Sequence, residues 1–162
     1  MTLGESGGLA FEDFRVGQKL TSRGRTMTEA DIRLFIGATG SDHPLHTDSE
    51  YSRRHPIIRD VCMQGLLSLS VLDGFLVDAL TRRMPVVMNY GHDRVRYLAP
   101  VYCGDTISAD FEVADCDRRD EAYGRVAIDC TLRNQRGEAV LFDRHLLIVG
   151  TRAQVRRVAG KI

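Results

Sequence analysis

The spacing of apolar residues along the chain changes near Pro85. Upstream of Pro85, leucines and other apolar residues recur at helical spacing, which predicts one long apolar helix over residues 65–80. Downstream, apolar and polar residues alternate, which predicts four consecutive strands. The strands are expected at 86–100, with an interruption near Gly91, and at 105–114, 123–133 and 139–150.

Helices that precede a run of consecutive strands indicate an α+β fold with an antiparallel sheet. The long helix has so little polar surface that it must be covered, which suggests that the sheet curves around it. Before this helix, residues 18–27 predict a first, partly exposed strand. Thr28 then has the type and place of a helix N-cap, and Gly40 suits the left-handed residue that ends the helix.

The most distinctive chemistry lies in the loop over residues 41–48, which reads SDHPLHTD. Pro44 fixes its own φ and restricts the residue before it, so the loop is expected to be rigid. Asp42 and His46 are groups that can move protons. Gly65 opens the long helix, where backbone N–H groups and the positive end of the helix dipole favour an oxyanion. We expect the loop and the start of the helix to face each other.

The composition fits one soluble globular domain of 162 residues, with 43% hydrophobic and 27% charged residues. Basic and acidic residues number 22 each, so the net charge gives no support to nucleic-acid or acidic-membrane binding. No apolar run is long enough to predict a membrane span. We therefore expect neither nucleic acid nor a membrane among the partners.

The four cysteines form no C-x-x-C pair, so the sequence predicts neither a metal site nor a redox motif. We expect reduced thiols and a cytoplasmic location. The first residues lack the pattern of a signal peptide. The predicted organisation is a disordered segment at 1–10, one domain at 11–150 and a loose basic tail at 151–162.

Three stretches resemble the MaoC-like hydratase family, which includes (R)-specific enoyl-CoA hydratases. The first is TGSDHPLHTD at residues 39–48, and it is the most specific. The others are GLL at 65–67, which opens the long helix, and VRYLAPVYCGDTI at 95–107. The resemblance covers most of residues 11–150. It implies a hotdog fold, in which an antiparallel sheet wraps around a long central helix, with chains paired into dimers.

The match to the family pattern has departures. Ser41 stands where the family loop usually has its Asp, and the only loop Asp upstream of Pro44 is the neighbouring Asp42. His43 replaces the usual Asn, and Gln64 replaces the usual His before the helix glycine. Asp73 falls where a Ser often stands, and we expect it to be buried unless it faces a pocket or a partner. The residues that carry over directly are Pro44, His46 and Gly65.

The resemblance implies addition of water to a 2-enoyl-CoA thioester, or the reverse elimination. In this chain, His46 would orient or deprotonate the water, and the Gly65 N–H would stabilise the enolate at the thioester oxygen. Asp42 would be the second acid or base. Further support is expected from Ser41, His43, Gln64 and Asp73, and substrate contacts from Pro44, Arg94 and Arg96.

We expect no metal and no cofactor beyond the CoA of the substrate, and a homodimer or a higher homo-oligomer. Two other interpretations stay open. A hotdog thioesterase would attack the thioester itself, with a carboxylate near the carbonyl. An acyl-CoA-binding or partner subunit with impaired catalysis would explain why Ser41 occupies the acidic position.

Overall fold

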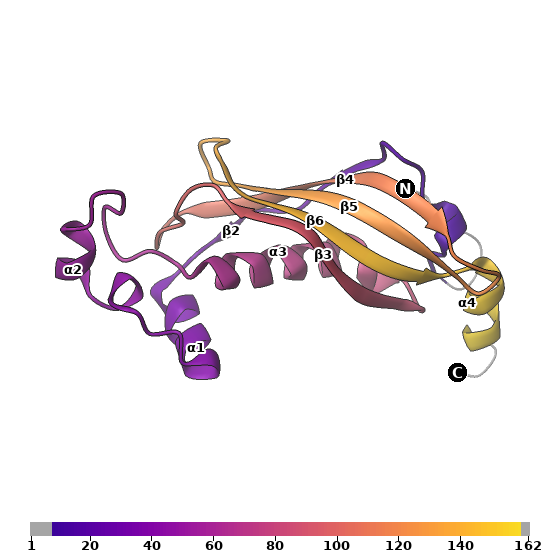
Figure 1. Ribbon diagram of the computed structural model, residues 1–162, viewed down its shortest axis with the longest axis horizontal. Helices are drawn as coiled ribbons and strands as arrows, with labels where there is room; N and C mark the ends of the chain where they lie inside the picture. Colours follow the sequence, from indigo (N-terminus) through magenta and orange to yellow (C-terminus); the bar gives the residue numbers. More distant parts are fainter. Residues whose placement is uncertain (1–7, 160–162) are drawn as a thin grey trace.

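A six-stranded antiparallel sheet curves over one long helix in the computed structural model, which describes residues 8–159 (Figure 1). The strands are β1 (Lys19–Thr21), β2 (Arg25–Thr26), β3 (Val87–Tyr97), β4 (Thr106–Arg118), β5 (Tyr123–Arg133) and β6 (Ala139–Gly150). The helices are α1 (Glu29–Thr39), α2 (Ser49–Arg53), α3 (Gly65–Ala79) and α4 (Arg152–Ala159). This architecture confirms the predicted α+β hotdog fold.

The strand order is β1-β4-β5-β6-β3, and β2 also pairs with β4. Each pairing is antiparallel, as the consecutive strands predicted. Strand β3 lies at one end of this order, and its pairing with β6 shifts register between Asn89 and Gly91. The predicted interruption near Gly91 is therefore confirmed. The first predicted strand is divided into β1 and β2.

The core lies between the sheet and one face of α3. The alternation predicted for β4 is confirmed, because every second side chain from Ile107 to Val113 is buried. From α3, the buried apolar side chains are Leu67, Val71, Leu72, Phe75 and Leu76. Full burial of such a side chain contributes about 1.5–3 kcal/mol, so this layer stabilises the fold.

The sheet covers only one face of α3. On the other face Leu66 is 60% exposed, and Asp73 and Val77 are also exposed. Asp73 was expected to be buried unless it faces a pocket or a partner, and in the single chain it is exposed on the α3 face that the sheet does not cover. Among residues 8–159, no helix combines the length and the apolarity that a membrane crossing requires.

Helix α1 begins and ends as the sequence predicts. Thr28 is its N-cap, and the Thr28 backbone N–H donates to Asp31 Oδ2 at 2.8 Å in a capping box. Gly40 ends the helix with φ of 69°, a left-handed conformation that glycine adopts without a steric penalty.

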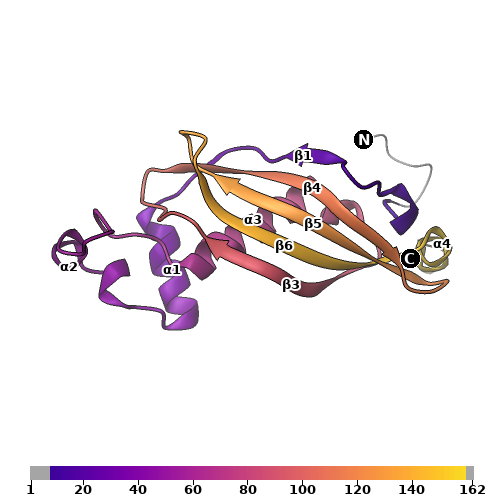
Figure 2. The same ribbon diagram turned by 45° about the horizontal axis from the view of Figure 1, so that its top comes forward.

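Helix α4 corrects the prediction of a loose basic tail. Val155 is buried, and the Arg152 backbone N–H donates to Glu12 Oε2 at 2.7 Å. Leu9 and Ala10 are also buried, so the predicted disordered segment does not extend to residue 10. The rest of these two predictions, at 1–7 and 160–162, lies outside the described residues. Figures 1 and 2 show α4 at the end of the sheet that is remote from α1 and α2.

Candidate active site

The loop at residues 41–48 is attached to the segment that enters α3. The Cys62 backbone N–H donates to Leu45 O at 3.2 Å, and Gln64 Nε2 donates to Ser41 O at 3.0 Å. His46 Nδ1 lies 2.8 Å from Cys62 O. Three hydrogen bonds thus join the loop to the residues just before Gly65. That the loop and the helix start face each other across one site stays a prediction.

The contact with Cys62 fixes the tautomer of His46. A carbonyl oxygen can only accept, so His46 Nδ1 must carry the hydrogen of this bond. In the neutral ring the lone pair therefore lies on Nε2, which can act as a base. The half-buried His46 lines a cavity of about 260 Å³ with Glu29, Arg33, Asp60, Tyr102 and Cys103, among others. The arrangement supplies an oriented base beside polar groups.

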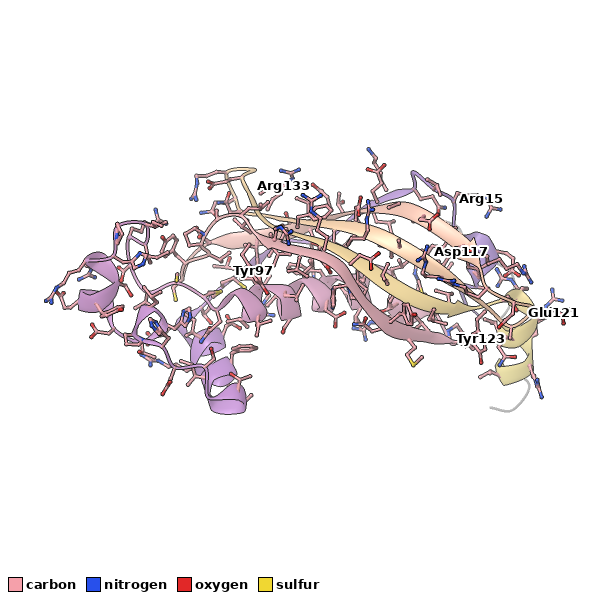
Figure 3. All side chains as sticks on the ribbon, viewed as in Figure 1. Arg15, Tyr97, Asp117, Glu121, Tyr123 and Arg133 are labelled. Atoms are coloured by element: carbon pink, nitrogen blue, oxygen red, sulfur yellow. The ribbon has the colours of Figure 1, made fainter. Side chains whose placement is uncertain are left out.

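Gly65 is needed at the start of α3 because an aromatic ring lies against it. A Cβ atom added to Gly65 would lie 2.9–3.0 Å from three ring carbons of Tyr97 on β3. Figure 3 shows Tyr97 over the beginning of α3. Burial raises the pKa of the Tyr97 hydroxyl, and the negative charge of Asp143 raises it further. Tyr97 was missed as a site residue, since only the folded strand brings it to Gly65.

Gly65 and His46 line different cavities in the described chain. Gly65 belongs to a cavity of about 300 Å³ that also includes Ser68 and Tyr97. Val61 lines the His46 cavity and Met63 lines the Gly65 cavity, so the two cavities lie along the same segment that enters α3. Gln64 within it is buried, and its Oε1 atom has no hydrogen-bond partner among residues 8–159. The helix start therefore carries a polar atom whose desolvation is not compensated.

The comparisons with known proteins identify the family of this chain. The profile described as "MaoC like domain" matches residues 13–132. The chain belongs to the MaoC-like domain family. Protein MaoC of Klebsiella aerogenes is 33% identical over 117 residues, which are 72% of this chain and 33% of that protein. The present MaoC-like chain thus spans a third of the length of that relative.

Two further proteins resemble this MaoC-like chain. A Rhodospirillum rubrum protein named (R)-specific enoyl-CoA hydratase is 32% identical over 104 residues, which are 64% of this chain and 68% of that protein. Among solved structures, the monoamine oxidase regulatory protein from Archaeoglobus fulgius superposes with a TM-score of 0.81 at 33% identity. The superposed region covers 89% of this chain and 95% of the Archaeoglobus chain.

The other predicted loop residues of this MaoC-like chain have mixed placements. Ser41 contributes its backbone carbonyl to the Gln64 contact, and Pro44 begins a 3₁₀ turn at residues 44–46. His43 is exposed, and its Nδ1 accepts from the Leu45 backbone N–H at 3.2 Å. Asp42 is exposed and is not among the residues that line the His46 cavity.

The two predicted arginine contacts lie on β3. The Arg94 guanidinium lies 5.4 Å from the centroid of the Phe142 ring. Because Phe142 alternates with the buried Asp143 along β6, Arg94 lies on the opposite face of the sheet from Asp143. Arg96 Nη1 donates to Val95 O at 2.7 Å. Neither arginine lines the His46 cavity or the Gly65 cavity.

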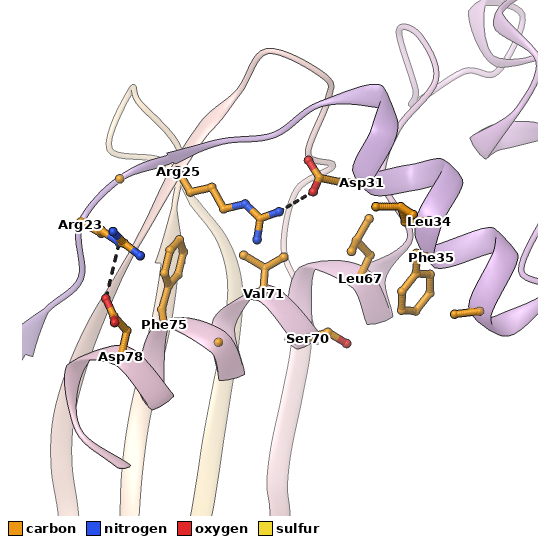
Figure 4. A pocket seen from close by; sticks show the side chains of 13 residues that line it. Arg23, Arg25, Asp31, Leu34, Phe35, Leu67, Ser70, Val71, Phe75 and Asp78 are labelled. Carbon is orange, nitrogen blue, oxygen red and sulfur yellow. Dashed lines mark hydrogen bonds and ion pairs between the residues drawn. The ribbon is translucent and has the colours of Figure 1, made fainter. Parts of the chain in front are cut away.

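A larger cavity of about 570 Å³ lies between α1 and α3 of the MaoC-like domain (Figure 4). Its apolar lining includes Phe35, Val71 and Phe75. At its rim Arg25 pairs with Asp31, and Arg23 pairs with Asp78 at 3.5 Å. Figure 4 shows Arg25 reaching Asp31 on α1, and Arg23 reaching Asp78 on α3, both from the segment that precedes α1. Both arginines at this rim are thus paired with a carboxylate of the same chain.

Proposed function

We propose that this MaoC-like domain is a hydratase or dehydratase that adds water to a 2-enoyl-CoA thioester or removes it from a 3-hydroxyacyl-CoA. The hydrogen bond between His46 Nδ1 and Cys62 O carries the proposal. It fixes a basic Nε2 on a ring that is attached to the entrance of α3. The Rhodospirillum rubrum relative is named for the same chemistry.

In the proposed reaction, His46 Nε2 takes a proton from water while the hydroxyl oxygen forms a bond to the β-carbon of the substrate. The electron pair of the double bond moves toward the thioester, and the resulting oxyanion accepts a hydrogen bond from the Gly65 N–H. The proposed substrate must therefore extend from the His46 cavity to the Gly65 cavity. Asp42 is proposed to deliver a proton to the α-carbon, a role that requires this exposed side chain to turn toward the substrate. General acid–base assistance of this kind typically contributes 10²–10⁴-fold, and one oxyanion donor about 2.7–4 kcal/mol.

The reaction is proposed to need no cofactor beyond the CoA of the substrate. We also propose that the chain works as a homodimer or a higher homo-oligomer. Support for a partner comes from apolar side chains that are exposed in the single chain, including Leu34 at 74%, Leu66 at 60% and Met88 at 63%. Exposed apolar surface of this kind is common where a second chain binds.

The test is an assay of purified protein with crotonyl-CoA. Hydration removes the ultraviolet absorbance of the conjugated enoyl thioester without releasing free thiol. We expect His46→Ala to lower kcat by about 100-fold or more. The matched control is His55→Gln, since His55 lies outside the loop and its Nδ1 accepts hydrogen bonds from the backbone N–H groups of residues 57 and 58.

An unchanged rate in His46→Ala would reject the role assigned to this histidine. Release of free thiol in place of hydration would instead identify a thioesterase. If neither reaction occurs but CoA thioesters bind, the chain is an acyl-CoA-binding or partner subunit. The exposed position of Asp42, away from the His46 cavity, is the observation that favours this second candidate.

A further inference from the structure

Two imidazoles flank one buried carboxylate where β3 pairs with β6. His92 Nδ1 lies 2.9 Å and 3.0 Å from the two carboxylate oxygens of Asp143. His145 Nδ1 lies 3.2 Å from Asp143 Oδ2. The two rings meet edge to face with centroids 4.7 Å apart. This cluster is outside the loop and the helix start that the proposed hydration uses.

The position of this cluster in the sheet is fixed by register. Asp143 and His145 are two residues apart on β6, so their side chains lie on the same face. His92 is the direct cross-strand partner of His145. Leu141 and Leu147 flank the two β6 residues on that face, and both are buried. The sequence thus places Asp143 and His145 between apolar side chains on one face of β6, with His92 beside them on β3.

Burying a carboxylate and an imidazole in an apolar layer is unfavourable unless their polar atoms have binding partners. Asp143 is fully buried and His145 is 2% exposed. A buried carboxylate needs a cation or hydrogen-bond donors, and within residues 8–159 the ion pairs recorded for Asp143 are both with histidines. His145 Nε2 is also buried and has no partner among these residues. Burial of such an atom is unfavourable, and it lies across the ring from the Nδ1 atom that faces Asp143.

We propose that His92, Asp143 and His145 bind a divalent transition-metal ion of the Zn²⁺ class. One ligand atom from each residue lies within 4.8 Å of the other two. Metal–ligand distances to His nitrogen and carboxylate oxygen are about 2.0–2.2 Å, so an ion fits between atoms about 3 Å apart in place of their hydrogen bonds. No covalent or redox step is involved.

The donor set determines the class of ion. Two imidazoles and one carboxylate suit zinc and neighbouring transition metals, whereas Ca²⁺ and Mg²⁺ prefer ligand sets made only of oxygen. The side chain of His92 is 29% exposed and gives the ion an entry path from solvent. Bound there, the ion would link the edge strand β3 to β6 through side chains. This proposal does not depend on the hydration activity.

The test uses the full chain after dialysis against EDTA and measures metal binding directly. Zn²⁺ titration by calorimetry should saturate at one equivalent, and Co²⁺ should give visible absorption bands from a nitrogen- and oxygen-ligated site. His92→Gln removes one ligand at a partly exposed position, so it should fold. Loss of this ligand should weaken Zn²⁺ binding by at least about 100-fold, since even indirect partners of metal ligands are worth 10–100-fold.

The unfolding midpoint, measured with and without Zn²⁺, distinguishes loss of metal binding from a folding defect. Saturating Zn²⁺ should raise the unfolding midpoint of the unmodified protein but not that of His92→Gln. His46→Ala is the matched control, because His46 Nδ1 and Cys62 Sγ, 4.0 Å apart, are a second close pair of potential metal-binding atoms. Binding lost in this control but kept in His92→Gln would overturn the proposal. Absence of stoichiometric Zn²⁺ and Co²⁺ binding would also overturn it.

Discussion

The close contact between Gly65 and Tyr97 predicts that Gly65→Ala destabilises the protein when Tyr97 is present and stabilises it when Tyr97 is replaced by alanine. In Gly65→Ala, the new Cβ would lie 2.9–3.0 Å from the Tyr97 ring, whereas favourable carbon contacts lie at about 3.5–4.0 Å. The ring must therefore move. Overpacking of this kind costs about 1–3 kcal/mol.

The same substitution also has a favourable component. Gly65 is the first residue of α3 and has helical geometry that alanine can adopt, and Gly→Ala at compatible sites stabilises by about 0.4–1 kcal/mol. In the unmodified protein we expect a net destabilisation on the order of 1–2 kcal/mol, because the steric cost exceeds this gain. In a Tyr97→Ala background the ring is absent, so Gly65→Ala should stabilise the protein by about 0.4–1 kcal/mol.

The four proteins of this double-mutant cycle would be unfolded in urea and followed by circular dichroism, with the free energy of unfolding and the m value fitted together. We expect a coupling energy between residues 65 and 97 within the usual range of about 0.5–3 kcal/mol for residues in contact. If Gly65→Ala destabilises both backgrounds equally, the steric reasoning is refuted. A changed m value would instead show that the unfolded or folded state had altered.

Two other properties can be tested on the isolated protein. Burial raises the pKa of Asp31, but hydrogen bonds from Thr28 and the charge of Arg25 outweigh it and hold this pKa below 3.8. Ionised Asp31 therefore stabilises the fold at pH values above its pKa in the unfolded chain, and this stabilisation is lost as the pH falls through its pKa in the folded protein. Asp31→Asn should thus lower the free energy of unfolding in urea by about 1 kcal/mol at pH 7 and by less at pH 3. An equal cost at both values would contradict this. Burial also raises the pKa of the Cys130 thiol, whereas Cys103 is exposed. Alkylation of the native protein, read by mass spectrometry, should modify Cys103 first, and early labelling of Cys130 would count against its burial.

Local signals in the sequence were enough for most of the fold. Thr28 and Gly40 specify the ends of α1 through their own side-chain and backbone preferences, and the structure places both as predicted. The alternation from Ile107 to Val113 likewise predicted which side chains of β4 are buried. Helix α4 was missed because its short, basic sequence acquires its contacts from residues near the start of the chain.

The candidate site was only partly accessible from sequence. His46 and its attachment to the helix entrance follow from a local motif, whereas its tautomer depends on the Cys62 carbonyl, sixteen residues away. The exposure of Asp73 in the single chain could not be predicted, because helical periodicity does not show which face of a helix a sheet will cover. The pairing of His92 with His145 depends on the register of two strands that are distant in sequence. No local pattern encodes that register.

The contact between the two ends of the described chain has a practical consequence. Arg152 Nη1 donates to Gly8 O at 2.9 Å, at the end of the sheet remote from α1 and α2. The described chain therefore begins and ends far from the His46 loop (Figure 1), and a tag or reporter fused directly to residue 8 or residue 159 would start at that distance. A short linker that joined residue 159 to residue 8, with new ends opened in the turn at 134–137, would give a circularly permuted protein in which that loop stays intact.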